Sequence, residues 1–354
     1  MIQGIHILYF VLVLATGFAA LVPLSVLPGP ARTTWNLAMV VVASLVVALR
    51  DVNFGADTRV YLRIFEDPAQ FDGDLEAAYM LALRTLGVIT QDGTLFLFAS
   101  SLAINFAIYA GFARLNARLA GLSFAFFTAT PVFWLANVLV LRNGLGAALV
   151  ALATIILVTS GRTRGFFAAV VTGALFHYSL LGHALLLAVG DLRSVRRVAI
   201  SVATLAVAGG ALVLMSSSFA AMAAPWVERY EDYQYYASTG QGAFRASSFE
   251  PQHAFPILIA FGAFLARRNL QPEEALLMRF YFVMVLMAVA FWGNVLFRDR
   301  LYLPAQMLEP LLFALLFRRL LDDKSFVLVS LLFLVAMGGV TVLLWGPRNV
   351  LQYY

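Results

Sequence analysis

Long apolar stretches alternate with short polar segments from one end of the chain to the other. Most stretches are about 17 to 25 residues long, the length that an α-helix needs to cross the hydrocarbon core of a bilayer. In the first half they cover residues 4–27, 35–49, 93–112, 119–139, 144–159 and 165–190. In the second half they cover residues 198–215, 254–266, 275–296, 301–317 and 326–345. The pattern predicts an all-α, polytopic transmembrane helix bundle with about 11 spans.

Composition supports one integral membrane domain over residues 1–354. Hydrophobic residues make up 62% of the chain and charged residues 12%, whereas a soluble domain has about 25% charged residues. The mean hydropathy is +0.87. No charged segment precedes the first stretch and no cleavage site follows it, so we expect a retained helix. Cysteine is absent, which excludes disulfides and thiolate metal ligands.

The positive charge of the chain is explained by topology. The net charge is +5 and the pI about 9.6, but the basic residues form short clusters between apolar stretches, which argues against nucleic-acid binding. The clusters are Arg114 and Arg118; Arg162 and Arg164; Arg193, Arg196 and Arg197; Arg267 and Arg268; and Arg318, Arg319 and Lys324. By the positive-inside rule these loops face the cytoplasm, and loops 51–92 and 219–252 face outward.

The stretch 165–190 conflicts with this topology if it crosses the membrane once. A single crossing would put the cluster at 193–197 outside. A re-entrant pair of half-helices that breaks near His177, Tyr178 and Ser179 restores every basic cluster to the cytoplasm. Such a break requires protein or a wet cavity around it. The alternative is one long tilted helix, with the basic cluster as an exception.

His177 is the ionisable side chain expected deepest in the membrane. Such side chains are costly and mark functional sites by default, and imidazole can transfer protons near neutral pH. The alternative is a histidine that bonds a neighbouring helix for packing. His183 lies six residues on and would not share its face of a helix, so we expect no metal site.

Three arginines lie on the predicted outer side, where topology does not explain them. Arg142 stands alone between two apolar runs, and Arg298 and Arg300 flank Asp299, with Tyr302 just beyond. A guanidinium can bind a phosphate or pyrophosphate bidentately. The alternatives are a snorkelling Arg142 at a helix end and a surface ion-paired turn at 298–300.

Acidic and aromatic residues alternate in both predicted external loops. Asp57 and Tyr61 are spaced i, i+4, and Glu76 and Tyr79 are spaced i, i+3, so each pair can share a helix face. The second loop contains Tyr230 and Tyr233 among acidic residues. Aromatic rings stack on sugars and carboxylates accept their hydroxyls, so these residues are candidates for saccharide binding. The alternative is a solvated loop whose tyrosines anchor at the interface.

These segments, in this order, resemble EpsG/Wzy-type polysaccharide polymerases over most of the chain. The segments are Asp57-Thr58-Arg59-Val60-Tyr61, Glu76 to Leu81, Leu141-Arg142-Asn143-Gly144 to Ala148, Phe176-His177-Tyr178-Ser179, Arg229 to Tyr233, and Arg300-Leu301-Tyr302. In one departure, Asn143 follows Arg142 where the family is associated with glutamine. The resemblance implies a GT-C-like fold and a bacterial inner-membrane enzyme that links lipid-carried repeat units.

The resemblance also implies roles and partners. Undecaprenyl-pyrophosphate-linked oligosaccharide would enter from the membrane lipid, Arg142 and Arg300 would neutralise the leaving pyrophosphate, and His177 would accept the proton of the acceptor hydroxyl. Asp57 and Glu76 would bind sugar or provide the base. A chain-length regulator and a flippase are expected protein partners. No nucleotide motif is present, and we expect no cofactor. The competing hypotheses are a ligase or other transferase of lipid-linked sugar, and a transporter of lipid-linked saccharide.

Overall fold

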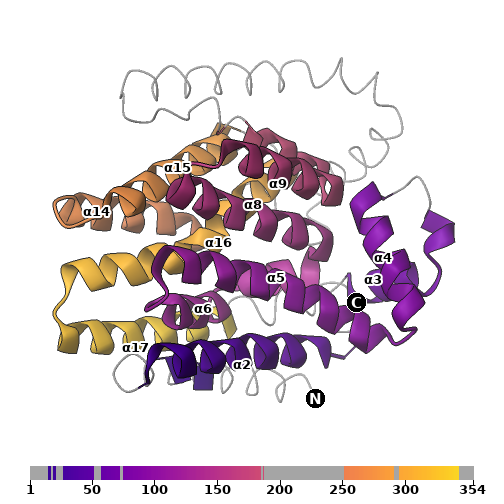
Figure 1. Ribbon diagram of the computed structural model, residues 1–354, viewed down its shortest axis with the longest axis horizontal. Helices are drawn as coiled ribbons and strands as arrows, with labels where there is room; N and C mark the ends of the chain where they lie inside the picture. The colour runs from indigo at the N-terminus through magenta and orange to yellow at the C-terminus, as the bar shows by residue number, and fades with distance from the viewer. Residues whose placement is uncertain are drawn as a thin grey trace.

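The computed structural model describes residues 15–16, 19–20, 27–51, 57–71, 75–184, 186, 251–290 and 295–342, and these residues form helices and turns without a strand. The first part contains α2 (Gly29–Ala48), α3 (Thr58–Glu66), η1 (Pro68–Phe71), α4 (Ala77–Ile89), α5 (Gly93–Asn116), α6 (Ala120–Ala129), α7 (Pro131–Trp134) and η2 (Leu135–Leu139). It continues with α8 (Leu141–Ser160), α9 (Thr163–Phe176) and η3 (Tyr178–Ala184). The last part contains η4 (Pro251–Ala254), α14 (Phe255–Ala266), α15 (Pro272–Ala290), α16 (Val295–Leu320) and α17 (Asp323–Val340). Figure 1 shows the long helices side by side.

The all-α prediction is confirmed for the described residues. Five helices are long and apolar enough to cross a membrane, and a bent pair raises the number to six. The five are α2, α5, α8, α17 and residues 298–320 of α16. The predicted stretches 4–27 and 198–215 lie largely or wholly outside the described residues, as do the basic cluster 193–197 and most of the loop 219–252.

Two predicted stretches are interrupted. The stretch 119–139 is not one straight span, because α6 and the segment 131–139 meet at a bend of 80°. Thr130 is extended there and Pro131 follows it, and the residue before a proline is disfavoured in a helix. The stretch 165–190 breaks where predicted: α9 ends at Phe176, His177 is extended and η3 begins. This break excludes one continuous helix, and the re-entrant pair stays a prediction.

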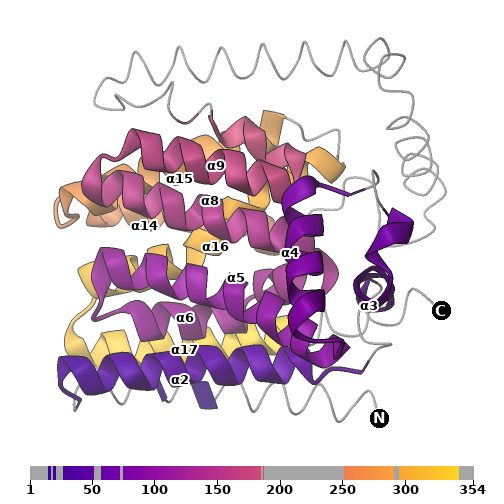
Figure 2. The ribbon, with the colours of Figure 1, turned by 45° about the vertical axis from the view of Figure 1, so that its right-hand side comes forward.

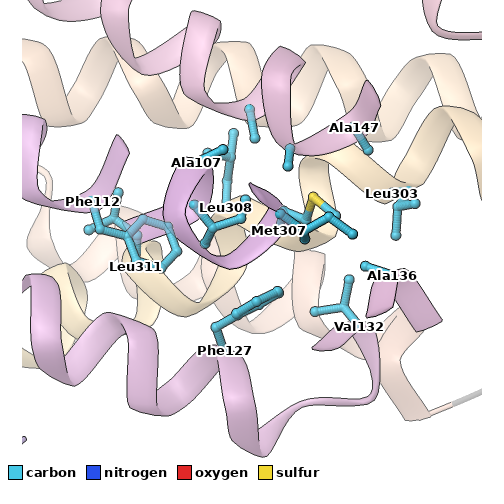
Figure 3. Close-up of a cluster of buried hydrophobic side chains, with 14 of the residues drawn as sticks. Ala107, Phe112, Phe127, Val132, Ala136, Ala147, Leu303, Met307, Leu308 and Leu311 are labelled. Carbon is cyan, nitrogen blue, oxygen red and sulfur yellow. The ribbon is translucent and has the colours of Figure 1, made fainter. Parts of the chain in front are cut away.

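The centre of the bundle is α16. Its membrane-length segment is the most deeply buried of the candidate spans. Figure 3 shows Met307, Leu308 and Leu311 of this helix among buried side chains of α5, α6 and α8. Every face of α16 packs against protein, so changes in its position are felt throughout the bundle.

A buried polar chain joins α2, α5 and η2. Asn105 Nδ2 donates to Ser44 Oγ at 2.9 Å, and Asn137 Nδ2 donates to Asn105 Oδ1 at 3.2 Å. In lipid, hydrogen bonds between helices replace the missing hydrophobic driving force for their association. This chain holds η2, a π-helical segment, directly before the start of α8.

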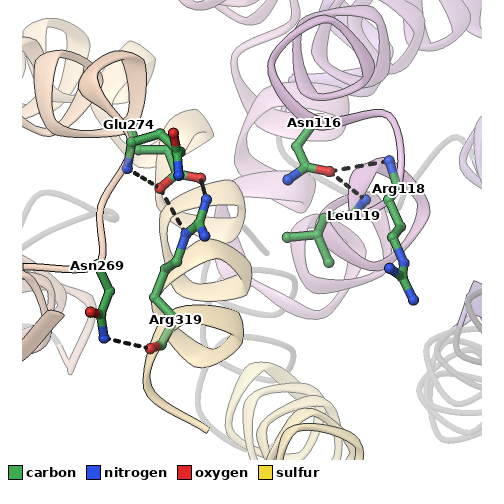
Figure 4. A network of polar contacts seen from close by, with 7 residues as sticks. Asn116, Arg118, Leu119, Asn269, Glu274 and Arg319 are labelled. Carbon is green, nitrogen blue, oxygen red and sulfur yellow. Dashed lines mark hydrogen bonds and ion pairs between the residues drawn. The ribbon is translucent and has the colours of Figure 1, made fainter. Parts of the chain in front are cut away.

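One end of the bundle is basic. Figures 1 and 2 show the α5–α6 and α16–α17 turns at the left and α3 and α4 at the right. Figure 4 shows the bidentate pair at the basic end, where Arg319 Nε and Nη2 lie 3.0 and 2.9 Å from the carboxylate oxygens of Glu274. The acidic and aromatic helices α3 and α4 therefore lie at the opposite end from these basic turns.

Helices α8 and α9 form an antiparallel hairpin that depends on two glycines. The hairpin turns at Gly161, which has a left-handed backbone with φ of 64°. A Cβ atom on Gly146 would lie 2.7 Å from the carbonyl oxygen of Gly173, and one on Gly173 would lie 3.0 Å from that of Gly146. The two backbones are therefore in direct contact. This contact fixes the start of α8 beside the end of α9.

We expect Gly146→Ala and Gly173→Ala each to destabilise the protein by about 1 to 3 kcal/mol, because the added methyl group forces the backbones apart. Thermal unfolding of the purified protein in detergent measures this change. Gly165→Ala is the matched control on α9, where an added Cβ would meet its nearest neighbour at 3.8 Å. If Gly146→Ala and Gly165→Ala unfold at the same temperature, the contact does not stabilise the bundle.

Candidate functional site

The acidic and aromatic helices meet the start of α8 through an ion pair. Glu76, the residue before α4, lies with Oε2 at 2.7 Å from Arg142 Nη1. The Arg142 side chain is 24% exposed and that of Glu76 14%, so the pair is stronger than a surface ion pair. The Arg142 guanidinium also lies 5.8 Å from the centre of the Tyr79 ring. Arg142 is therefore fixed by α4 and is more than a snorkelling side chain.

Tyr61 and Tyr79 are the aromatic part of the site. Both rings are buried, and they meet edge to face with centres 6.3 Å apart. Tyr61 Oη donates to the carbonyl of Leu139 at 3.4 Å, which ties α3 to the end of η2. The buried hydroxyl of Tyr79 has no hydrogen-bond partner among the described residues. A buried hydroxyl without a partner is costly.

Asp57 precedes α3 and lies near both predicted phosphate-binding arginines. Burial raises the pKa of Asp57 to about 6, and the positive charges of Arg142 and Arg300 act against this rise. The carboxyl group is thus poised to exchange a proton near neutral pH. Burial and the negative charge of Asp57 raise the pKa of Tyr61, so Tyr61 stays a neutral hydroxyl.

His177 lies at the break after α9, where Arg300 and Arg142 both act electrostatically on its buried ring. The backbone N–H of Ser179 lies 3.4 Å from Nδ1 and the Ser179 hydroxyl 2.9 Å from it. A backbone N–H can only donate, so this contact favours the tautomer with its proton on Nε2. In that tautomer Nε2 donates a hydrogen bond and does not accept a proton.

Arg300 joins the cluster from α16, which is distant in sequence from the other site residues. Its charge acts on both Asp57 and His177. Within the part of the chain that the structure describes, its guanidinium forms no ion pair with a carboxylate. The structure therefore brings together Asp57, Tyr61, Glu76, Tyr79, Arg142, His177 and Arg300, which come from four separate parts of the sequence.

Arg298 and Tyr302 contact a different set of residues. Arg298 Nε lies 2.7 Å from Asp299 Oδ1, and Tyr302 Oη donates to Glu309 Oε1 at 2.6 Å. Residues two apart on a helix point about 200° away from each other, so Arg298 and Tyr302 project away from Arg300. Tyr281 also donates to Glu309 Oε1, at 3.0 Å, so Tyr302 belongs to a buried polar cluster between α15 and α16.

Two further predicted site residues cannot be placed in the described structure. Tyr230 and Tyr233 lie outside the described residues. Among the residues that are described, no group of three or more histidine, aspartate or glutamate side chains is placed to hold a metal ion.

Arg50 is a neighbour of the site that the sequence interpretation missed. It follows α2, and its Nε donates to Thr58 Oγ1 at 3.0 Å, while Nη1 donates to the carbonyl of Val47 at 3.0 Å. Burial lowers the pKa of Arg50 to about 10, and Tyr61 acts against this fall. Its position on the predicted outer side was the available signal, as it was for Arg142.

One comparison with known proteins gives a match. The model of the EpsG family matches residues 34–353, which is most of the chain. No curated protein and no solved structure matches.

The raised pKa of Asp57 predicts a pH-dependent stability. The folded protein keeps its proton up to about pH 6, whereas an unfolded aspartate loses it near pH 4. The folded state therefore binds more protons in this window, and stability falls as pH rises from about 4 to about 6, by up to about 3 kcal/mol. Asp57→Asn should remove this part of the pH profile of thermal unfolding, and Asp67→Asn, an exposed control, should not. An unchanged profile in Asp57→Asn contradicts the assignment.

The ion pair between Glu76 and Arg142 predicts an energetic coupling. Glu76→Gln should lower the free energy of unfolding by about 1 to 3 kcal/mol, because it leaves a largely buried guanidinium without its carboxylate. Adding Arg142→Gln should cost less in this variant than in the wild type. Denaturation of the four proteins measures the coupling, with the exposed Glu66→Gln on α3 as control. Strictly additive effects would show that the pair contributes nothing.

Proposed function

Because this chain belongs to the EpsG family, we propose that it is a membrane glycosyltransferase that polymerises lipid-linked oligosaccharide repeat units into an exopolysaccharide or O-antigen chain. The reaction takes place at the external face of the bacterial inner membrane. The observation that carries the proposal is the convergence of two arginines, one raised-pKa carboxyl group and one buried histidine at one end of an apolar helix bundle.

The donor is a saccharide chain on undecaprenyl pyrophosphate. Arg142 and Arg300 bind its pyrophosphate, because guanidinium groups match phosphate oxygens in charge and geometry. Glu76 engages Nη1 of Arg142 at 2.7 Å and holds the guanidinium in place for the ligand. Arg300, which forms no ion pair among the described residues, gains its counter-ion when the donor binds. The donor therefore completes the electrostatics of the site.

The reaction joins the acceptor sugar to the reducing end of the donor chain. A hydroxyl oxygen of the acceptor attacks the anomeric carbon of the donor, and the bond from that carbon to the pyrophosphate oxygen breaks. The electron pair leaves with the pyrophosphate, whose growing charge Arg142 and Arg300 stabilise. The hydroxyl proton passes to the carboxylate of Asp57, whose pKa of about 6 suits a base near neutral pH.

His177 acts as a hydrogen-bond donor in this scheme. With Nδ1 accepting from Ser179, Nε2–H points its proton to a ligand, and the nearest charges on the ring are those of Arg300 and Arg142. The leaving pyrophosphate is the matching acceptor. This role differs from that of proton acceptor, which the resemblance implied for His177.

The sugar is held beside the base by aromatic side chains. Tyr79 has a buried hydroxyl without a partner among the described residues, and Tyr61 lies edge to face against its ring. A sugar hydroxyl would complete the hydrogen bonding of Tyr79. Arg298 and Tyr302, on another side of α16, stay predicted saccharide-binding residues.

We expect variants of the site to separate these roles in cells that lack their own copy of the protein. Asp57→Asn and Arg142→Gln should collapse the ladder of repeat units to one lipid-linked unit at the outer face, with transfer reduced by about 10²-fold or more. His177→Gln keeps a donor near Nε2 and should retain a longer ladder than His177→Ala. Gel analysis of lipid-linked and surface saccharide measures each outcome, with protein level as the folding check.

The matched control is Arg114→Gln, which removes an arginine bonded to Thr159 at the basic end and should leave the ladder normal. Equal loss in His177→Gln and His177→Ala, with activity kept in Asp57→Asn, would return the role of base to His177. One added unit in place of a ladder would identify a ligase. Lipid-linked units that accumulate at the inner face would identify a transporter.

A further inference from the structure

His183 is a fully buried histidine that the proposed reaction does not use. It lies in η3, six residues after His177, and both ring nitrogens face backbone carbonyl oxygens. Nε2 is 3.1 Å from the carbonyl oxygen of Leu301, and Nδ1 is 3.2 Å from that of Leu180. The first contact crosses from η3 to α16 and ends on the residue next to Arg300.

The segment of α16 that carries Arg300 is weakened by a proline. Pro304 lies inside the helix and has no N–H, so the carbonyl of Arg300 loses its partner four residues on. The proline ring also crowds that carbonyl and bends the helix. The first turns of α16 therefore need support from outside the helix.

The η3 segment is in place to give that support. Leu180 is completely buried against the Gly146 position of α8, and an added Cβ on Gly182 would lie 3.1 Å from the Leu301 side chain. The segment is thus wedged between α8, which carries Arg142, and α16, which carries Arg300. His183 supplies the hydrogen bond that this packing cannot.

We propose that His183 is a positioning residue, whose Nε2–H donates to the Leu301 carbonyl and so holds Arg300 in place opposite Arg142 and His177. The inference rests on the proposed function, because it assigns Arg300 to the leaving pyrophosphate. A neutral imidazole carries one N–H, which in this assignment lies on Nε2. A shift of about 1 Å in such a group can lower the rate by about 10²-fold.

Two amide variants separate the two contacts of His183. The amide nitrogen of glutamine falls near the position of Nε2, and that of asparagine near the position of Nδ1. His183→Gln should therefore keep the bond to Leu301 and transfer within about threefold of the wild type. His183→Asn and His183→Leu should both transfer about 10- to 100-fold more slowly. The measurement is the transfer rate of the purified, membrane-reconstituted protein with lipid-linked repeat units.

Thr154→Val is the control for the loss of a buried polar group, because the Thr154 hydroxyl donates to the carbonyl of Val150 in its own helix. It should keep wild-type transfer. If His183→Leu does not fold, the comparison of Gln with Asn still decides the question. Equal rates for His183→Gln and His183→Asn overturn the inference.

A double-mutant comparison tests whether His183 acts through Arg300. In an Arg300→Lys protein, which retains charge but loses the guanidinium, His183→Leu should cost far less than in the wild type. Independent, multiplying losses overturn the inference. If Arg300→Lys and Arg300→Gln both transfer normally, the proposed role of Arg300 fails instead, and the two failures are distinguishable.

Discussion

The candidate site depends on the contact between Gly146 and Gly173. Arg142 lies four residues before the first glycine and His177 four residues after the second, so each is about one helical turn from the crossing point. The two helices run antiparallel, and their closest approach therefore brings these side chains to the same end of the bundle. Helices in lipid associate closely where small residues meet. A larger side chain at Gly146 or Gly173 would therefore move Arg142 and His177 apart, although neither residue is itself substituted.

The second constraint is the position of α16. The charge of Arg300 acts on Asp57 and His177, whereas Arg298 and Tyr302 contact Asp299 and Glu309. A single central helix thus contributes to two polar clusters within one buried structure. Rotation of this helix would break the contacts of Arg298 and Tyr302 with Asp299 and Glu309. The packing that stabilises the bundle also fixes the direction of Arg300.

The sequence predicted the parts of the fold that periodicity and charge control. The long spans α2, α5, α8 and α17 lie where apolar stretches predicted them, and α9 breaks at His177, a position identified by a conflict with the charge rule. The bend at Thr130 was missed, because no charged residue interrupts the stretch 119–139. Its signal was Pro131. The sequence interpretation also did not predict that Arg298 and Arg300 contact different groups of residues. That difference depends on how α16 is rotated about its axis, which packing against neighbouring helices determines.

The sequence indicated several residues that lie close together in the structure, but it did not specify their surroundings. Asp57 and His177 are both titratable, and burial decides what each can do: the Asp57 carboxyl is shifted toward neutral pH, while the contact from the Ser179 N–H directs the His177 proton to Nε2. The first property depends on segments that are distant in sequence, and the second on the extended backbone at His177. A buried carboxyl group between two arginines is less easily protonated than burial alone would make it. If, as we propose, a pyrophosphate binds those arginines, it would weaken this restraint and make Asp57 a stronger base when the donor is in place.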